Sequence, residues 1–375
     1  MVNVGISRLK AVAAKLNAVI EKSKINPKAG WVELETSEKE LLFKASNYDY
    51  YFCANMPVEA LEGASLHCTV SADTFIPLVA KLEEKEANLS VGPNVLLVTT
   101  GNSEYSFPLL KEAGQVKRIE EIPFIDRGAK SFTVPSKVLR SVAELNTRGV
   151  ISAEVCRDIQ RYIYVDGKGA ITFTDSVYLN DFSGDYGQFR FLLTVSQAKL
   201  LNILAGDGDA TILLREGVSE ASPLGVKVIG EGFFLVFCTQ PPEKVMQFPA
   251  IRLRGLADMG SESHVILDKK SLEKALTRLM VFDKKWDASV LNYSQLEFSE
   301  NELKLVSVRS KNYEILAYKS SVSPENRVVI LRFADLLQQI KLLTSKEVDI
   351  SYGTSPAIVI NAPEMKQLIP EIRRE

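Results

Sequence analysis

One pattern of about 125 residues occurs three times in succession along this chain. In each copy a short apolar strand leads through a polar turn into a helix, and a second strand follows. The matching helix positions are Phe75, Leu200 and Leu336, which are 125 and 136 residues apart. Tandem self-similarity of this kind constrains the architecture more strongly than any single motif does.

The first half of each copy adds a helix and a hairpin. Apolar residues at i, i+4 and i+7 form one stripe on a helix. These residues are Leu9, Ala13 and Leu16, then Val138, Val142 and Leu145, then Leu272, Leu276 and Leu279. Segments beginning at Trp31, Tyr162 and Gln295 alternate apolar and polar residues around a polar turn, which predicts strands with one buried face.

Each copy therefore holds two helix-plus-strands units, and the chain holds six. The sequence predicts an α+β fold of three tandem domains, in which two helices per domain pack on antiparallel sheets. The expected domains cover residues 1–125, 126–255 and 256–375.

Composition narrows the functional classes. The chain has no apolar stretch near 18 residues and no signal-peptide layout at its N-terminus, so we expect a cytoplasmic protein without a membrane span. Its four cysteines are far apart and form no CxxC pair, which favours free thiols over a disulfide or a metal site. Only two histidines, His67 and His264, are present, so we expect no metal site built on histidines and no catalytic histidine.

The formal net charge is −2, but the charges are distributed unevenly. The predicted helices 6–24, 71–82, 136–147, 196–205, 269–280 and 332–343 hold 15 Lys and Arg against 5 Asp and Glu, and the rest of the chain holds 30 against 42. Any solvated helix face carries lysines, which is the plain interpretation for one helix. The same bias on six helices favours a helical surface that faces a polyanion.

Neither a helix-turn-helix, a zinc finger nor an aromatic stacking platform accompanies these charges. Phosphate contacts alone hold duplex DNA regardless of sequence and permit sliding. The residues expected to contact DNA are Arg8, Lys15, Lys22, Lys24, Arg140, Arg157, Lys199, Lys270, Lys274 and Arg278.

Several segments then point to one family. They are Arg157-Asp-Ile-Gln-Arg-Tyr-Ile-Tyr-Val-Asp-Gly, Thr172-Phe-Thr-Asp-Ser-Val-Tyr-Leu, Gln247-Phe-Pro and Asn301-Glu-Leu-Lys-Leu. With the three tandem repeats, they make the whole chain resemble the bacterial sliding clamp, the β subunit of DNA polymerase III, as a divergent member. The resemblance implies a processivity factor without enzymatic activity or a cofactor. It also implies a head-to-tail homodimer that closes a ring around duplex DNA, with helices lining the hole.

The resemblance also implies where the two chains of the ring meet. The first domain of one chain would contact the third domain of the other, with Tyr105 and Phe107 packing on Val281 and Phe282. A head-to-tail interface needs two different complementary patches of this kind. The alternative is that Tyr105 and Phe107 point into their own core.

The family's partner pocket lies between the second and third domains. It would bind the peptide motifs of the replicative polymerase, the clamp loader and other clamp-binding proteins. The corresponding wall here is Ile163, Thr174, Val177, Tyr178, Leu179, Pro249, Leu253, Arg254, Val359, Ile360, Pro363 and Met365. Apolar walls with a few polar groups suit peptide anchors, although Ile163 and Leu179 taken alone read equally well as core.

The chain departs from the family pattern at three places. Asp175-Ser-Val-Tyr replaces the usual Asp-Gly-His-Arg, which removes a histidine and an arginine from the pocket rim. The segment from Lys22 to Lys28 replaces a Pro-rich loop, and the chain continues beyond Met365 for ten residues. The first difference predicts an altered peptide preference, and the tail would either cover the pocket or form an extra turn. Together the differences indicate a divergent bacterial or phage-encoded member.

Two other classes of protein compete with a clamp. No GxxxxGK[ST] loop is present, and the lone Asp-Gly-Asp at 207–209 lacks further carboxylates, so we expect no enzymatic activity. The alternative is a protein-interaction scaffold of the same fold that does not encircle DNA.

Overall fold

The computed structural model describes residues 1–20, 27–37, 39–47, 49–58, 60–61, 65–149, 158–173, 176–204, 208–217, 221–258, 262–283, 294–362 and 365–372. The chain divides into two compact units. Unit 1 comprises Met1–Ala143 and Phe191–Val245, and unit 2 comprises Glu144–Arg190 and Met246–Glu375. Within the described residues no helix is long and apolar enough to cross a membrane.

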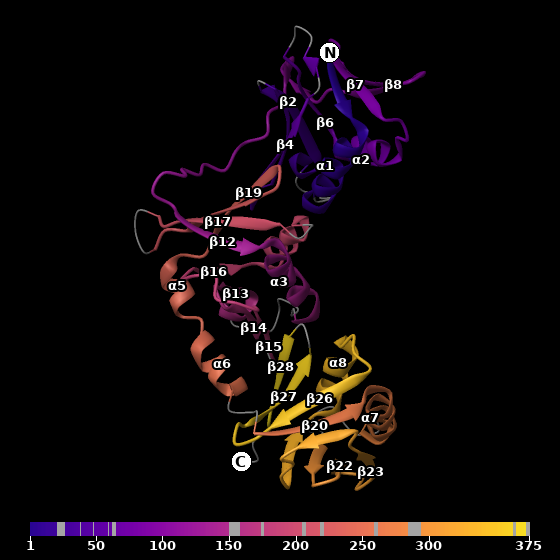
Figure 1. The fold of residues 1–375 in the computed structure, drawn as a ribbon, viewed down its shortest axis with the longest axis vertical. Coiled ribbons are helices and arrows are strands. Elements are labelled where there is room, and N and C mark those ends of the chain that lie inside the picture. The colour runs from indigo at the N-terminus through magenta and orange to yellow at the C-terminus, as the bar shows by residue number, and fades with distance from the viewer. Residues whose placement is uncertain are drawn as a thin grey trace. The chain divides into compact units, whose positions relative to one another are not determined.

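One building block, a strand, a helix and three further strands, recurs six times in the element order (Figure 1). The first two blocks are β1 (Val2–Gly5), α1 (Ile6–Val19), β2 (Trp31–Ser37), β3 (Glu40–Ser46) and β4 (Tyr50–Pro57), then β6 (His67–Ser71), α2 (Ala72–Lys81), β7 (Glu86–Val91), β8 (Val95–Thr100) and β9 (Ser103–Pro108). The next two are β12 (Lys130–Pro135), α3 (Ser136–Gly149), β13 (Ile163–Asp166), β14 (Gly169–Phe173) and β15 (Val177–Asp181), then β16 (Arg190–Leu193), α4 (Val195–Leu200), β17 (Asp209–Arg215), β18 (Leu224–Gly230) and β19 (Phe233–Thr239).

The last two blocks are β20 (Ser263–Asp268), α7 (Lys269–Asp283), β21 (Ser294–Phe298), β22 (Glu302–Ser307) and β23 (Tyr313–Ala317), then β25 (Arg327–Leu331), α8 (Phe333–Leu342), β26 (Glu347–Tyr352), β27 (Ala357–Ala362) and β28 (Met365–Pro370). The six predicted helices are thus confirmed. Short elements complete the chain: β5 (Ala60–Leu61), β10 (Lys111–Glu112), β11 (Gln115–Val116), β24 (Ser320–Val322), α5 (Pro242–Met246), α6 (Ala250–Asp258) and the 3₁₀ turns η1 (Pro27–Gly30), η2 (Asp158–Arg161) and η3 (Leu201–Ile203). Sequence reasoning missed α5 and α6.

Unit 1 contains two large antiparallel sheets. Their strand orders are β5-β1-β7-β8-β9 and β12-β17-β18-β19-β4-β3-β2-β6. Helix α1 packs against α2, and its buried side chains follow the 3.6-residue period. At the start of α4, Thr194 and Gln197 form a capping box, each side chain hydrogen-bonding the backbone of the other.

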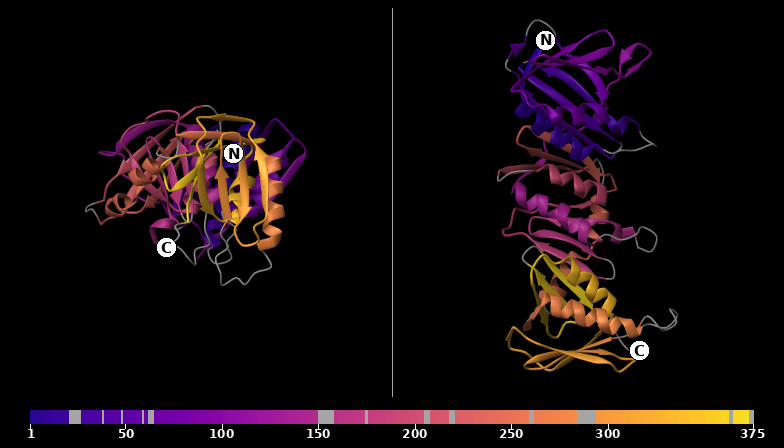
Figure 2. Two further views of the ribbon diagram at one scale, coloured as in Figure 1. Left: turned by 90° about the horizontal axis from the view of Figure 1, so that it is seen from below. Right: turned by 90° about the vertical axis from the view of Figure 1, so that its right-hand side faces the viewer.

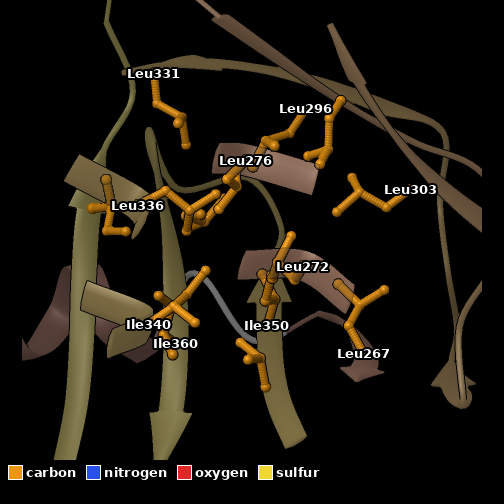
Figure 3. Close-up of a cluster of buried hydrophobic side chains, with 14 of the residues drawn as sticks. Leu267, Leu272, Leu276, Leu296, Leu303, Leu331, Leu336, Ile340, Ile350 and Ile360 are labelled. Atoms are coloured by element: carbon orange, nitrogen blue, oxygen red, sulfur yellow. The ribbon is translucent and has the colours of Figure 1, made fainter. Parts of the chain in front are cut away.

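Unit 2 contains two antiparallel sheets of its own. One includes β13-β14-β15-β28-β27-β26-β20-β24 in that order, and the other is β23-β22-β21-β25. Helices α7 and α8 pack side by side (Figure 2). Side chains from both helices and both sheets meet in one buried cluster, in which Leu276, Leu303, Leu336 and Ile350 are fully buried (Figure 3).

Two seams within the chain join equivalent strands of successive repeats. The last strand of a repeat's first block pairs with the last strand of the following repeat: β4 pairs antiparallel with β19 inside unit 1, and β15 pairs antiparallel with β28 inside unit 2. Both seams continue a sheet from one repeat into the next. The remaining strands of these two types, β23 and β9, each lie at the edge of a sheet among the described residues.

Candidate functional site

Five of the cations predicted to contact DNA carry no ion pair within the described residues. Lys199, Lys270, Lys274 and Arg8 are exposed, and Arg140 is partly buried. They lie on α4, α7, α1 and α3, on the sides opposite the buried stripes. Their charges are therefore available to a polyanion.

Two other predicted DNA contacts are engaged inside the chain. Lys15 lies 5.1 Å from the centre of the Phe233 ring and its Nζ is 3.5 Å from the carbonyl oxygen of Glu231. Arg278 forms a two-point ion pair with Glu314, with Nε–Oε1 at 2.6 Å. The Arg278 guanidinium lowers the pKa of the Glu314 carboxyl, so this carboxylate stays charged and competes for Arg278. The remaining predicted contacts Lys22, Lys24 and Arg157 lie outside the described residues.

The free edge strand β9 has an inner and an outer face. Phe107 is 5% exposed and packs edge-on against Phe75 of α2, with 5.6 Å between ring centres. The prediction that Phe107 lies at an interface is therefore wrong, because its ring already fills the core of its own repeat. Tyr105 is only partly buried at the same edge.

Tyr105 occupies the same sheet position as a residue of an internal seam. It lies opposite Val98, as Leu235 lies opposite Val228 in β18 and β19. Leu235 is fully buried because its strand pairs with β4, where its partner is Phe52. The edge at β9 thus has the geometry of half of such a seam.

The residues predicted to form the other half of the contact between two chains lie at the end of α7. Val281 and Phe282 are 55% and 44% exposed, which is unusual for large apolar side chains. On the edge strand β23, Tyr313 and Ile315 are 58% and 48% exposed, but they alternate with Glu314, which pairs with Arg278 of α7, and so lie on the sheet face turned away from that helix. Unit 2 therefore exposes apolar side chains at the end of α7 and, on the other face of the sheet, along strand β23.

The linker after the second repeat covers one face of strands β13 to β15. The Phe248 ring stacks on Tyr164 at 5.0 Å and meets Phe173 edge-on at 5.3 Å. Arg254 of α6 forms a two-point ion pair with Asp166, at 2.6 and 2.8 Å, and this carboxylate raises the pKa of the arginine. Both contacts fix the linker on the sheet.

The predicted peptide pocket is only partly on this linker-covered face. Strand pairing places Val177 opposite Leu368, and Leu368 opposite Val359. Leu179 lies on the same face as Val177 and lines a cavity of about 460 Å³ with Arg254. Carboxylates of Asp181, Asp185 and Asp258 and the Lys168 amine also line it, together with Phe182, Gly184 and Ala257.

Four predicted pocket residues face the other way. Tyr178 accepts a hydrogen bond from Gln339 of α8 at 2.6 Å, and Ile360 belongs to the core beneath α7 and α8 (Figure 3). Met365 receives a hydrogen bond from the buried Gln367, the strand partner of Tyr178. Ile163 precedes Tyr164 and so points away from Phe248. The prediction that these four line the pocket is wrong, because adjacent strand residues point to opposite faces.

The other predicted wall residues lie on the linker-covered face or in the linker itself, or lie outside the described residues. Pro249 and Leu253 belong to the linker, and Leu253 is buried. Thr174 and Pro363 lie outside the described residues. Sequence reasoning missed Phe248, Tyr164, Phe173 and Leu368, although strand alternation marks the last three. Among the described residues, no group of three or more His, Cys, Asp and Glu side chains could hold a metal ion.

Comparison with solved structures identifies the fold. The chain aligns over its full length with the DNA polymerase III β subunit from Thermotoga maritima, with a TM-score of 0.74, 16% identity and 99% of that chain covered. The chain has the sliding-clamp fold. The β subunit from Streptococcus pyogenes gives a TM-score of 0.73 at 15% identity over 99% of both chains. The sliding clamp from Bacillus subtilis gives 0.71 at 14% identity over 100% of this chain and 99% of its own.

Comparison of the sequence alone gives no assignment beyond the sliding-clamp fold. No family model matches the chain, and no curated protein matches it. The resemblance predicted from the repeats and motifs is thus confirmed at the level of fold, and the identities of 14–16% fit a divergent sequence.

Proposed function

We propose that this protein is a processivity factor that encircles duplex DNA as a head-to-tail dimer and tethers a DNA polymerase. The observation that carries the proposal is the pair of internal seams, β4 with β19 and β15 with β28, together with the two unmatched edges of the same types. In a dimer, β9 of each chain would pair with β23 of the other, which adds two more seams of the same kind. A heterologous contact of this kind closes a ring when the rotation fits.

The charge of the helices supports duplex DNA as the ligand of the ring. Free cations on α1, α3, α4 and α7 would contact phosphates without reading bases. Such contacts are individually weak and break readily in salt. Ring closure would retain the protein on DNA without tight binding.

The linker-covered face of β13 to β15 supports the tethering role. Val177, Leu179 and Val359 provide apolar walls beside the cavity that Arg254 lines. Concave apolar sites with a few charged groups suit short peptide anchors. We expect the replicative polymerase, a clamp loader and other partners to bind here through peptide motifs, in the cytoplasm and without enzymatic activity of the clamp itself.

Retention on DNA of different topology tests the proposal. The protein is loaded on nicked circular duplex by its loader, and half of the sample is then cut at one site. A ring stays on the circle and leaves the linear form through its ends. Equal retention on both forms would favour the scaffold that does not encircle DNA. Light scattering supplies the second measurement, because a two-chain ring has twice the chain mass of 41.6 kDa.

A further inference from the structure

The four-stranded sheet of the third repeat leaves one face open. Leu296, Leu303 and Leu331 point from its strands toward the helices (Figure 3). Their neighbours along each strand therefore point to the opposite face. There Val328 and Ile315 are 51% and 48% exposed.

Strand registers define this open face. Its two rows are Val328–Glu297–Lys304–Ile315 and Ile330–Gln295–Val306–Tyr313. The rows place apolar residues on β25, on β22 and on β23, with the polar residues of β21 between them. At a strand spacing of about 4.8 Å these apolar borders are roughly 10–15 Å apart. An extended segment spans that distance in three or four residues.

The equivalent face of the first repeat is covered by a segment of its own chain. Glu35 there lies between His67 and Leu42, as Glu297 lies between Val328 and Lys304. The covering segment contributes Ile119, Ile122 and Phe124, which pack on Tyr51, Cys53, Trp31, Leu42, Phe234 and Val236.

Polar contacts hold this first covering segment in place. The buried carboxylate of Glu33 accepts a hydrogen bond from the backbone N–H of Ile119 at 2.6 Å. Glu121 accepts a hydrogen bond from the Tyr51 hydroxyl at 2.9 Å and lies 3.5 Å from the Lys44 amine. The first face thus binds an extended segment with apolar anchors and a carboxylate.

In the second repeat, a segment of the chain also covers the equivalent sheet face, but through different residues. Its face carries Tyr164, Ile171 and Leu179 in one row. Phe248 covers it, and the Arg254–Asp166 ion pair holds the linker there. Two of three equivalent faces therefore hold an apolar segment, whereas the third exposes its apolar residues. Of the residues after β28 that the structure describes, Ile372 lies at its border, where its N–H donates a hydrogen bond to the Ile330 carbonyl.

We propose that the open face of the third repeat is a docking surface for an extended peptide segment of a partner protein. The segment carries two aliphatic or aromatic anchors three residues apart and a carboxylate beside them. Lys304 lies opposite Glu297, 2.9 Å from its carboxylate, and receives the carboxylate of the segment. In the first repeat Lys44 contacts both Glu35 and Glu121 in this way, although it lies two residues further along its strand than Leu42, the residue that matches Lys304 in register. This surface belongs to the third repeat alone, so the inference does not depend on ring closure or on the linker-covered pocket.

A peptide taken from the first covering segment provides the probe. A fluorescent peptide with the sequence of residues 115–126 is titrated with the full chain by anisotropy. We expect saturable binding that the double variant Ile315→Glu, Val328→Glu weakens at least tenfold, because two anchors lose their apolar partners. The matched control is Ile251→Glu, a residue that is 91% exposed on α6, and it leaves binding unchanged. Far-ultraviolet circular dichroism confirms that the variants fold.

Three outcomes would overturn the proposal. The first is equal affinity of the double variant, which would place the peptide on another face. The second is no binding up to the solubility limit of the peptide. The third is wild-type self-association that rises with protein concentration and disappears in the double variant, which would assign the face to a second copy of the chain. Retention of the protein on circular DNA is measured in parallel. If retention is lost while the peptide affinity stays the same, the result contradicts the proposed ring and leaves the docking surface standing.

Discussion

Replacing Lys270 and Lys274 of α7 together by alanine tests the DNA-facing assignment of the helices. Both side chains are exposed, and neither has a carboxylate partner within the described residues. Each phosphate contact contributes about 0.9 to the slope of log K against log salt concentration. The double variant of a two-chain ring therefore lowers the magnitude of that slope by up to about 3.6.

Fluorescence anisotropy on a short duplex, from 50 to 300 mM salt, measures this slope for the wild type and the variant. We expect weaker binding at low salt and convergence at high salt, because screening removes the contribution of both lysines. An unchanged slope would refute the assignment of α7 to the DNA-facing surface. Unchanged light-scattering mass shows that the substitutions leave the assembly intact.

The Arg278–Glu314 pair supplies the matched control. Glu314 holds Arg278 through two hydrogen bonds, and its lowered pKa keeps the carboxylate charged at neutral pH. Glu314→Gln removes this competitor and releases one cation per chain. We expect the slope to become steeper by up to about 1.8 in a dimer, whereas Arg278→Ala alone has little effect.

Three further predictions concern the ring edge, the linker and the thiols. Tyr105→Glu puts a charge into the seam that β9 would form, so the light-scattering mass at micromolar concentration falls to that of one chain; a mass that stays doubled contradicts the edge assignment. Phe248→Ala removes a buried ring, which costs about 3–5 kcal/mol, and speeds hydrogen exchange of the β13 and β14 amides; unaltered exchange there means that the ring does not hold the linker. Burial raises the pKa of Cys53 to about 11 and of Cys68 to about 12, so of the three described thiols iodoacetamide at pH 8 alkylates the exposed Cys238 before the two buried ones; peptide mapping that shows equal rates for the three would mean that the first repeat is packed differently.

The sequence predicts the periodic elements and misses what depends on tertiary contact. The apolar stripe through Leu272, Leu276 and Leu279 marks α7 because helix burial leaves a 3.6-residue period. The short helix α6 leaves a weaker pattern, since only Ala250, Leu253 and Ala257 are buried on it. Its position depends on Arg254 reaching Asp166, 88 residues earlier, and no local pattern encodes that contact.

The errors at the predicted peptide pocket have one physical source. Strand residues alternate between two faces, so a pocket transferred by position must respect that alternation. Tyr178 and Leu179 are adjacent and were both assigned to the pocket, but Tyr178 bonds Gln339 on the helix side. The error at Phe107 has a different source, because its ring packs on Phe75 of α2, a tertiary contact that no property of strand β9 alone reveals.

The two seams inside the chain have a thermodynamic consequence for a ring. A strand tethered by its own polypeptide meets its partner at a local concentration in the millimolar range, however dilute the solution. The contact between β9 and β23 of separate chains has no tether and obeys mass action. In the proposed ring, dilution would therefore break two joints only, and each broken ring would yield intact arcs of three repeats.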